Sequence, residues 1–203
     1  MLQDRFLPET KLRKKRGRIN TLDELIAEYP EIDEVIADGI GITTRMPKRR
    51  QKKNYSGKSK KHEKKSVLIV NGKSGLILER TEFRPRAVHD KRILEEDRLY
   101  GKLRDPNLKK RADSAWTGED SSKNWIVNKR AVRGHPLTDK DKKENKALSR
   151  IRIKVEHAIR RIKIFKRIGD KTSFRAKNKL SEVFNVAINL ANYKQLSRFS
   201  AKA

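Results

Sequence analysis

The sequence contains no cysteine, which excludes disulfide bonds and metal sites built on thiolates. Its longest apolar run is VLIV at residues 67–70, far short of the roughly 20 residues that a membrane-spanning helix needs. The first 18 residues have no apolar core of the secretory signal-peptide type. The four histidines show no spacing typical of a metal site. These absences favour a cytoplasmic or nucleoid-associated protein without a membrane partner.

Acidic residues are also scarce, with 26 Asp and Glu against 53 Lys and Arg, a formal net charge of +27. A surplus of this size indicates a polyanionic partner, and nucleic acid fits it better than an anionic membrane surface. The length of 203 residues suits one domain with a basic extension. A hydrophobic content of 34% is enough for one modest core.

The pattern along the chain predicts one α/β domain behind a basic N-terminal segment. Residues 1–20 are basic and lack periodicity, which predicts a flexible arm, and a capping signal at Thr21 predicts a short helix ending near Tyr29. The predicted strands are residues 34–43, 66–71, 75–83, 109–118 and 124–131, and the predicted helices are 89–100, 139–168 and 174–199. Consecutive strands followed by strand–helix alternation predict a mixed sheet packed by helices.

The stretch LSRIRIKVEHAIRRIK, residues 148–163, contains one acid, Glu156, among six arginines and lysines. Its apolar residues recur at steps of three and four, which predicts a helix with one buried stripe. At about 100° per residue, Arg152, Glu156 and Lys163 fall within an arc of about 40° that borders this stripe. An ordinary ion-pair ladder on a solvated face explains the pattern, and so does a carboxylate at the edge of a cleft.

Two further acids, Asp38 and Asp113, lie among small or apolar residues, within a predicted strand and at the end of another. Taken singly, an Asp-Gly turn explains Asp38 and a loop or cap acid explains Asp113. If Asp38, Asp113 and Glu156 met at one edge of the sheet, they would repel one another unless cations bound between them. Hard divalent cations such as Mg²⁺ prefer such all-oxygen sites. Composition and periodicity leave both interpretations open.

Two basic segments, residues 48–53 and 58–65, flank Tyr55. They are interpreted as a surface that follows a phosphate backbone, with a solvated loop as the alternative. Trp116 and Trp125 are expected in the core or a cleft wall. The candidate DNA-contacting residues are Arg49, Arg50, Lys58, Lys60, Lys61, Arg152, Arg160 and Lys163.

Four segments together resemble the DDE-type transposases of bacterial insertion sequences, in the branch similar to Harbinger-like nucleases. They are EYPEIDEVIADGIGITTRMPKRRQKKNYSGKSKKH, RAVHDKRIL, ADSAWTG and the closing block, in which Arg152, Glu156 and Lys163 fit arginine, three residues, glutamate, six residues, lysine. The resemblance covers residues 20–170. It implies a ribonuclease H-like fold, two Mg²⁺ ions (replaceable by Mn²⁺), and cleavage of DNA at element ends followed by strand transfer into target DNA.

The resemblance also assigns roles and boundaries. It implies Asp38, Asp113 and Glu156 as catalytic metal ligands, and a homo-oligomer in the transposition complex. Asp90 would have a supporting place, with the alternative that it substitutes for a catalytic acid. Residues 31–203 would be the catalytic domain, and residues 1–30 a remnant of a DNA-binding region or a linker, without most of the helix-turn-helix domain usual in the family. The alternative is a truncated, inactive transposase or another basic nucleic-acid-binding protein without catalysis.

Overall fold

The computed structural model describes residues 13–14, 17–18, 32–97, 103, 108–116, 125–133, 135–170 and 177–200. Its elements are β1 (Arg13–Lys14), β2 (Gly17–Arg18), β3 (Glu34–Thr43), α3 (Gln51–Asn54), β4 (Tyr55–Ser56), β5 (Lys61–Asn71), β6 (Ile77–Arg80), β7 (Arg84–Pro85), α4 (Asp90–Glu95), β8 (Lys109–Ala112), the 3₁₀ turn η1 (Ser114–Trp116), β9 (Trp125–Val127), α6 (Asp139–Lys163), α7 (Lys166–Gly169) and α8 (Lys177–Ser200). The predicted helix at 21–29 and most of the predicted arm at 1–20 lie outside the described residues. Within the arm, β1 and β2 form a short antiparallel pair.

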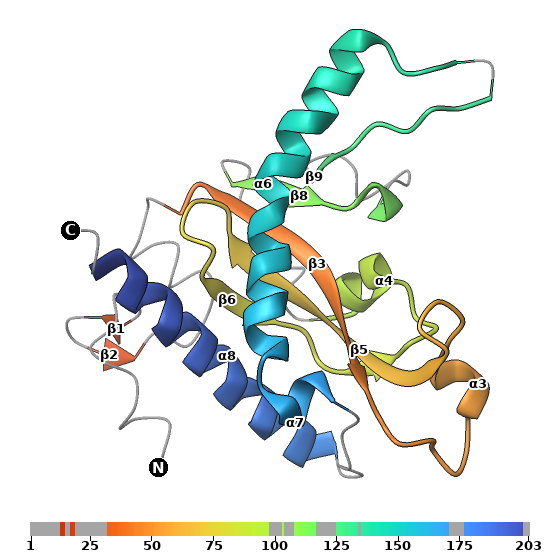
Figure 1. The fold of residues 1–203 in the computed structure, drawn as a ribbon, viewed down its shortest axis with the longest axis vertical. Helices are drawn as coiled ribbons and strands as arrows, with labels where there is room; N and C mark the ends of the chain where they lie inside the picture. The colour runs from red at the N-terminus through yellow and green to blue at the C-terminus, as the bar shows by residue number, and fades with distance from the viewer. Residues whose placement is uncertain are drawn as a thin grey trace.

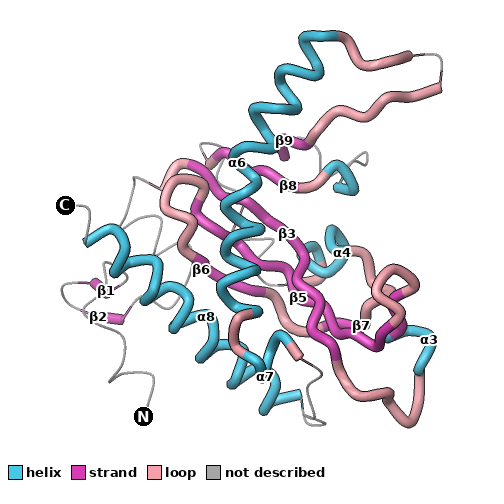
Figure 2. Tube along the Cα trace, in the orientation of Figure 1, coloured by secondary structure: helices cyan, strands magenta, loops and turns pink. Residues whose placement is uncertain are grey.

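The main sheet is mixed, with strand order β4-β5-β3-β8-β9 and with β6 and β7 also paired to β5 (Figure 1). The β5, β6 and β7 pairings are antiparallel, whereas β8 runs parallel to β3 and β9 runs parallel to β8. Two long helices, α6 and α8, lie over one face of the sheet (Figures 1 and 2). This confirms the predicted mixed α/β, ribonuclease H-like fold.

Strand alternation divides the core into two layers, because successive side chains point to opposite faces. Ile36, Ile40 and Ile42 of β3 pack with α6, α7 and α8, in one buried cluster. Val35 and Ala37 of the same strand pack in a second cluster on the other face, with α4 and Trp116. The buried position of Trp116 confirms its expected place in the core.

Several boundaries differ from the predictions; strands β6, β8 and β9, for example, are shorter than predicted. Strand β5 begins at Lys61 instead of residue 66, because the basic residues before Ser66 pair with β3 and β4. The helix predicted for 139–168 is two helices, since Phe165 leaves the helical conformation (φ −72°, ψ 110°) between α6 and α7. Helix α4 ends at Glu95, and residues 98–100 of its predicted span lie outside the described part.

None of the described helices has a stretch both long and apolar enough to cross a membrane.

Candidate carboxylate site

The two candidate aspartates, Asp38 within β3 and Asp113 just after β8, lie on the same face of the sheet. Asp38 has the strand parity of Ile36 and Ile40, so it faces α6. In the parallel pairing of β3 and β8, Ile36 lies opposite Arg111. Continuing this register by two residues on each strand brings Asp38 beside Asp113. Ala112 packs in the opposite layer, so the next residue turns toward α6.

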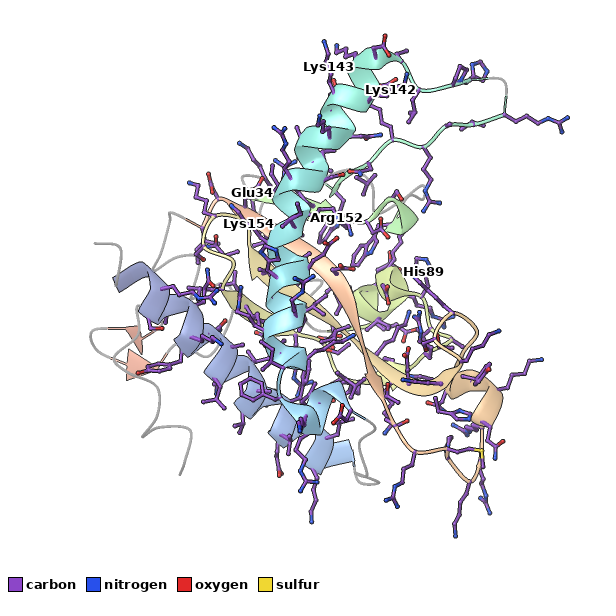
Figure 3. The ribbon with its side chains drawn as sticks, viewed as in Figure 1. Glu34, His89, Lys142, Lys143, Arg152 and Lys154 are labelled. Atoms are coloured by element: carbon purple, nitrogen blue, oxygen red, sulfur yellow. The ribbon has the colours of Figure 1, made fainter. Side chains whose placement is uncertain are left out.

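Arg152 of α6 joins the two aspartates. Its Nη1 lies 3.3 Å from Oδ1 of Asp113, and its Nη2 lies 3.7 Å from Oδ2 of Asp38. The Arg152 side chain is only 16% exposed, and Figure 3 labels it where α6 passes β3 and β8. A single guanidinium therefore provides the positive charge between two carboxylates that would otherwise repel each other.

Asp38 is the more enclosed of the pair, with 21% of its side chain exposed against 46% for Asp113. Burial raises the pKa of Asp38 to about 6, against the opposing effects of Arg152 and of the Gly39 N–H. That N–H donates to Oδ1 of Asp38 at 2.8 Å. The nearby charges of Asp113 and Asp90 raise the Asp38 pKa further. Burial is thus the main reason that the pKa of Asp38 is raised, and the neighbouring acids add to it.

Asp113 is oriented by the turn that follows β8. The backbone N–H of Ser114 donates to Oδ1 of Asp113 at 2.7 Å, and the Ser114 hydroxyl lies 3.3 Å from the same oxygen.

Asp90, at the start of α4, forms an ion pair of 2.6 Å with Lys65, a buried lysine of β5. Its carboxylate also lies against Gly39: a Cβ added there would come within 2.6 Å of Oδ2 of Asp90. A side chain at position 39 would therefore displace the Asp90 carboxylate, and Gly39 lies within strand β3 rather than in a turn. Asp90 thus contacts the strand of Asp38 at Gly39, and its expected supporting role stays a prediction.

Lys65 is a buried residue that the sequence analysis missed, and it lies on the α4 face of the sheet, opposite the face of Asp38. It was included in the basic segment 58–65, interpreted as a surface that follows a phosphate backbone, whereas it is 6% exposed. The available signal was its position directly before the buried SVLIV run, where a lysine on an inward position needs a carboxylate partner.

Glu156 lies one helical turn beyond Arg152 on α6, and its side chain is exposed. Among the described residues, no group of three acidic or histidine side chains is close enough to hold a metal ion. The structure thus brings Asp38 and Asp113 together through Arg152, and it places Glu156 outside this cluster.

The predicted DNA-contacting residues other than Arg152 are all exposed. Arg160 and Lys163 extend from the C-terminal part of α6, and the others surround α3, β4 and the start of β5: Arg49, Arg50, Lys58, Lys60 and Lys61. Tyr55 is 44% exposed, with its ring edge-on to His62 at 5.5 Å. These side chains are accessible to a large anionic ligand.

Comparisons with known proteins identify the family of the chain. A family model described as DDE superfamily endonuclease matches residues 37–192, a range that includes the two aspartates, Arg152 and Glu156. A probable transposase for insertion sequence element IS702 from Microchaete diplosiphon is 30% identical over 146 residues. The match covers 70% of this chain and 50% of that protein, so the chain spans about half the length of this relative. No solved structure gives a significant match.

Proposed function

The chain belongs to the DDE superfamily endonucleases, and from this premise we propose that it cleaves and joins DNA strands as the catalytic part of an insertion-sequence transposase. The observation that carries the proposal is the pair Asp38 and Asp113, on two adjacent parallel strands or their ends and 3.7 and 3.3 Å from one guanidinium. In this proposal residues 31–203 form the catalytic domain. The substrates are the DNA ends of the element and the target DNA, within a homo-oligomeric complex.

The side chains at this site suit a hard divalent cation. Asp38 and Asp113 offer only carboxylate oxygens, which Mg²⁺ prefers. The raised pKa of Asp38, due to burial and to neighbouring acids, indicates that additional positive charge is favourable there. We assign Asp38, Asp113 and Glu156 as the ligands. When bound, two Mg²⁺ ions, or Mn²⁺ in their place, would clamp the attacking and leaving oxygens of an in-line phosphodiester displacement.

The surrounding residues then have separate roles. The N–H groups of Gly39 and Ser114 fix the two aspartate carboxylates in place. Arg152 compensates their charge and is near enough to contact a phosphate that enters beside them. Arg160, Lys163 and the exposed cations between residues 49 and 61 contact the DNA backbone without reading its sequence.

Nicking of supercoiled plasmid DNA by the purified chain, with Mg²⁺ or Mn²⁺ and with EDTA, tests this function. Loss of a metal ligand should lower the nicking rate more than loss of a residue that only supports a ligand. Glu156→Gln and Asp38→Asn should therefore each lower the nicking rate more than about 100-fold. Glu182→Gln provides the matched control, because Glu182 is an exposed acid on α8, distant in sequence from the site. Its rate should equal that of the unmodified chain.

The same assay separates catalysis from simple binding. If the unmodified chain binds DNA and does not nick it with either metal, the alternative of a non-catalytic basic DNA-binding protein is correct. If nicking persists in Glu156→Gln and is lost in Asp38→Asn, the assignment of Glu156 as the third ligand is wrong.

A further inference from the structure

The N-terminal half of α6 and the segment before it extend away from the sheet as one projecting arm, residues 128–133 and 135–150 (Figure 1). No residue of this arm is buried; the first buried residue of α6 is Val155. Figure 3 places Lys142 and Lys143 at the far end of the arm, beyond the strands. The arm therefore does not contribute to either core cluster.

Polar contacts hold the two limbs of the arm together. The Lys129 ammonium lies 2.6 Å from Asp141 and 2.8 Å from Glu144. Its bond to Asp141, together with the bonds from Thr138, lowers the pKa of Asp141 to about 2. Asn145 accepts from the Lys129 N–H and donates to its carbonyl, both at 2.9 Å. Thr138 and Asp141 form a capping box that starts the helix. Because polar contacts order the arm although it has no apolar core, we infer that its exposed surface has a function.

The charges of the arm are distributed unequally between inside and outside. All three of its acids take part in internal ion pairs, Asp141 and Glu144 with Lys129 and Asp139 with Lys142. Six exposed cations have no ion pair within the described part of the chain: Arg130, Arg133, Lys140, Lys143, Lys146 and Arg150. The outer surface of the arm is consequently almost purely positive.

The helical cations also share a direction. At about 100° per residue, Lys143, Lys146 and Arg150 fall within an arc of about 60°, on the side opposite Asp141 and Asn145, which hold the other limb. Twelve residues of helix span about 18 Å, roughly half a turn of duplex DNA. This length allows several contacts to consecutive phosphates.

We propose that the projecting arm binds the phosphate backbone of a DNA duplex, as a second DNA-binding surface besides that of residues 49–61. The inference rests on the proposed function for its choice of DNA. The arm has no aromatic residue, whereas protein–protein interfaces depend on aromatic anchors in apolar pockets. A surface made of arginine and lysine without such anchors is typical of backbone contacts to DNA.

The salt dependence of DNA binding tests the proposal. The arm variant carries Arg130→Gln, Arg133→Gln, Lys143→Gln and Lys146→Gln, and it retains Lys129, Asp141, Glu144 and Asn145, which hold the arm. Each neutralised phosphate contributes about −0.9 to the slope of log K against log salt. The slope should therefore become shallower by about 3 to 4 for a 30-base-pair duplex.

A control variant loses the same charge elsewhere, through Lys166→Gln, Arg167→Gln, Lys179→Gln and Lys194→Gln, all exposed cations on α7 and α8. It should keep the slope of the unmodified chain. Equal slopes for the arm variant and this control would overturn the proposal. Circular dichroism and thermal unfolding establish that both variants are folded.

Cross-linking provides a second test that does not depend on the fourfold variant. Because the chain has no cysteine, Lys146→Cys and Lys179→Cys each give one site for a thiol-specific photo-cross-linker. We expect cross-links to duplex DNA from position 146 and not from position 179; the reverse result would contradict the proposal. Neither test needs metal or cleavage, so the two proposals can fail separately. Absence of nicking would refute the proposed function and leave the arm proposal intact. Unchanged DNA binding by the arm variant would refute the arm proposal and leave the proposed function intact.

Discussion

Ionisation of the buried Asp38 carboxyl is unfavourable in the metal-free protein, and its neighbours only partly offset this. Burial and the charges of Asp113 and Asp90 oppose its ionisation, while Arg152 and the Gly39 N–H favour it, and the balance raises its pKa to about 6. A carboxyl whose pKa is raised on folding adds stability below its unfolded value, near 3.8, and this contribution is lost as the pH rises through about 6.

We therefore expect Asp38→Asn, which resembles the protonated acid, to stabilise the metal-free protein at pH 8 and not at pH 4. A shift of about two units corresponds to a difference of about 2–3 kcal/mol at most. Urea unfolding in EDTA at several pH values measures it. A stability difference between variant and unmodified chain that stays constant from pH 4 to pH 8 would contradict the assigned pKa.

Asp33→Asn is the control with the opposite sign. The Lys73 ammonium, 3.0 Å away, lowers the pKa of Asp33, so its contribution is present above the unfolded pKa and is lost in acid. This variant should be slightly destabilised at pH 8. The effect should be small because both side chains are well exposed.

The face on which a single residue lies could be predicted from the sequence where the alternation of a strand determines it. Asp38 and Asp113 share a face because a strand alternates every residue and because β3 and β8 are in register. The place of Arg152 between them was not predicted, since it was expected to contact phosphate. The periodicity of a helix gives directions around its own axis, and it does not give the rotation of that axis over a sheet.

At the scale of elements, that rotation is set by contacts between α6 and the β5–β6 turn. Lys154 donates to the carbonyls of Gly72 and Lys73, and Arg161 donates to the Gly75 carbonyl at 2.6 Å. With Val155 and Ile162 buried in the core, these bonds leave Arg152 directed at the aspartates. They join residues more than 80 positions apart, which explains why local pattern did not reveal them.

Besides its apolar packing, helix α8 makes two hydrogen bonds to the sheet through one buried polar side chain, Asn192. Asn192 accepts from the Ile77 N–H at 2.9 Å and donates to the Ile77 carbonyl at 2.7 Å, and it is 4% exposed. Asn192→Leu would leave both backbone groups of Ile77 without these partners, at about 1–3 kcal/mol each. We expect a loss of about 2–4 kcal/mol in the free energy of unfolding, measured with urea.

The neighbouring exposed Lys194 gives the comparison for this change, since Lys194→Ala alters the same helix turn outside the core. Its effect should stay within about 0.5 kcal/mol. An Asn192→Leu protein as stable as Lys194→Ala would show that water replaces the two bonds and that α8 is held by apolar packing alone.

Element identity was largely predictable from the sequence, and the limits were at positions with competing signals. The strand at 34–43 was predicted with its observed bounds because its apolar and small residues alternate. The break at Phe165 was missed because the apolar period continues unchanged across it to Ile168, which is buried from α7 instead. The β5 extension was missed because its lysines lack strand propensity and are placed by pairing.

For the whole molecule, the formal charge of +27 makes stability depend on ions in two opposite ways. Repulsion among the cations destabilises the compact free protein, and salt screens this repulsion. Bound DNA removes the repulsion and adds its own stabilisation, which salt weakens through the phosphate contacts. The melting temperature should thus rise with NaCl for the free chain, while the increase caused by DNA should shrink.

Duplex DNA at about 100 times its Kd adds about 2.7 kcal/mol. For a chain of this length that corresponds to a rise of about 5–10 °C in the melting temperature. We expect this rise at 20 mM NaCl and its near disappearance at 500 mM, measured by scanning calorimetry in EDTA. Chloride serves better than sulfate, because sulfate strengthens burial by itself. A DNA-induced rise that is equal at both salt concentrations would mean that contacts other than phosphate neutralisation dominate, and the basic surfaces would not be the main DNA-binding sites.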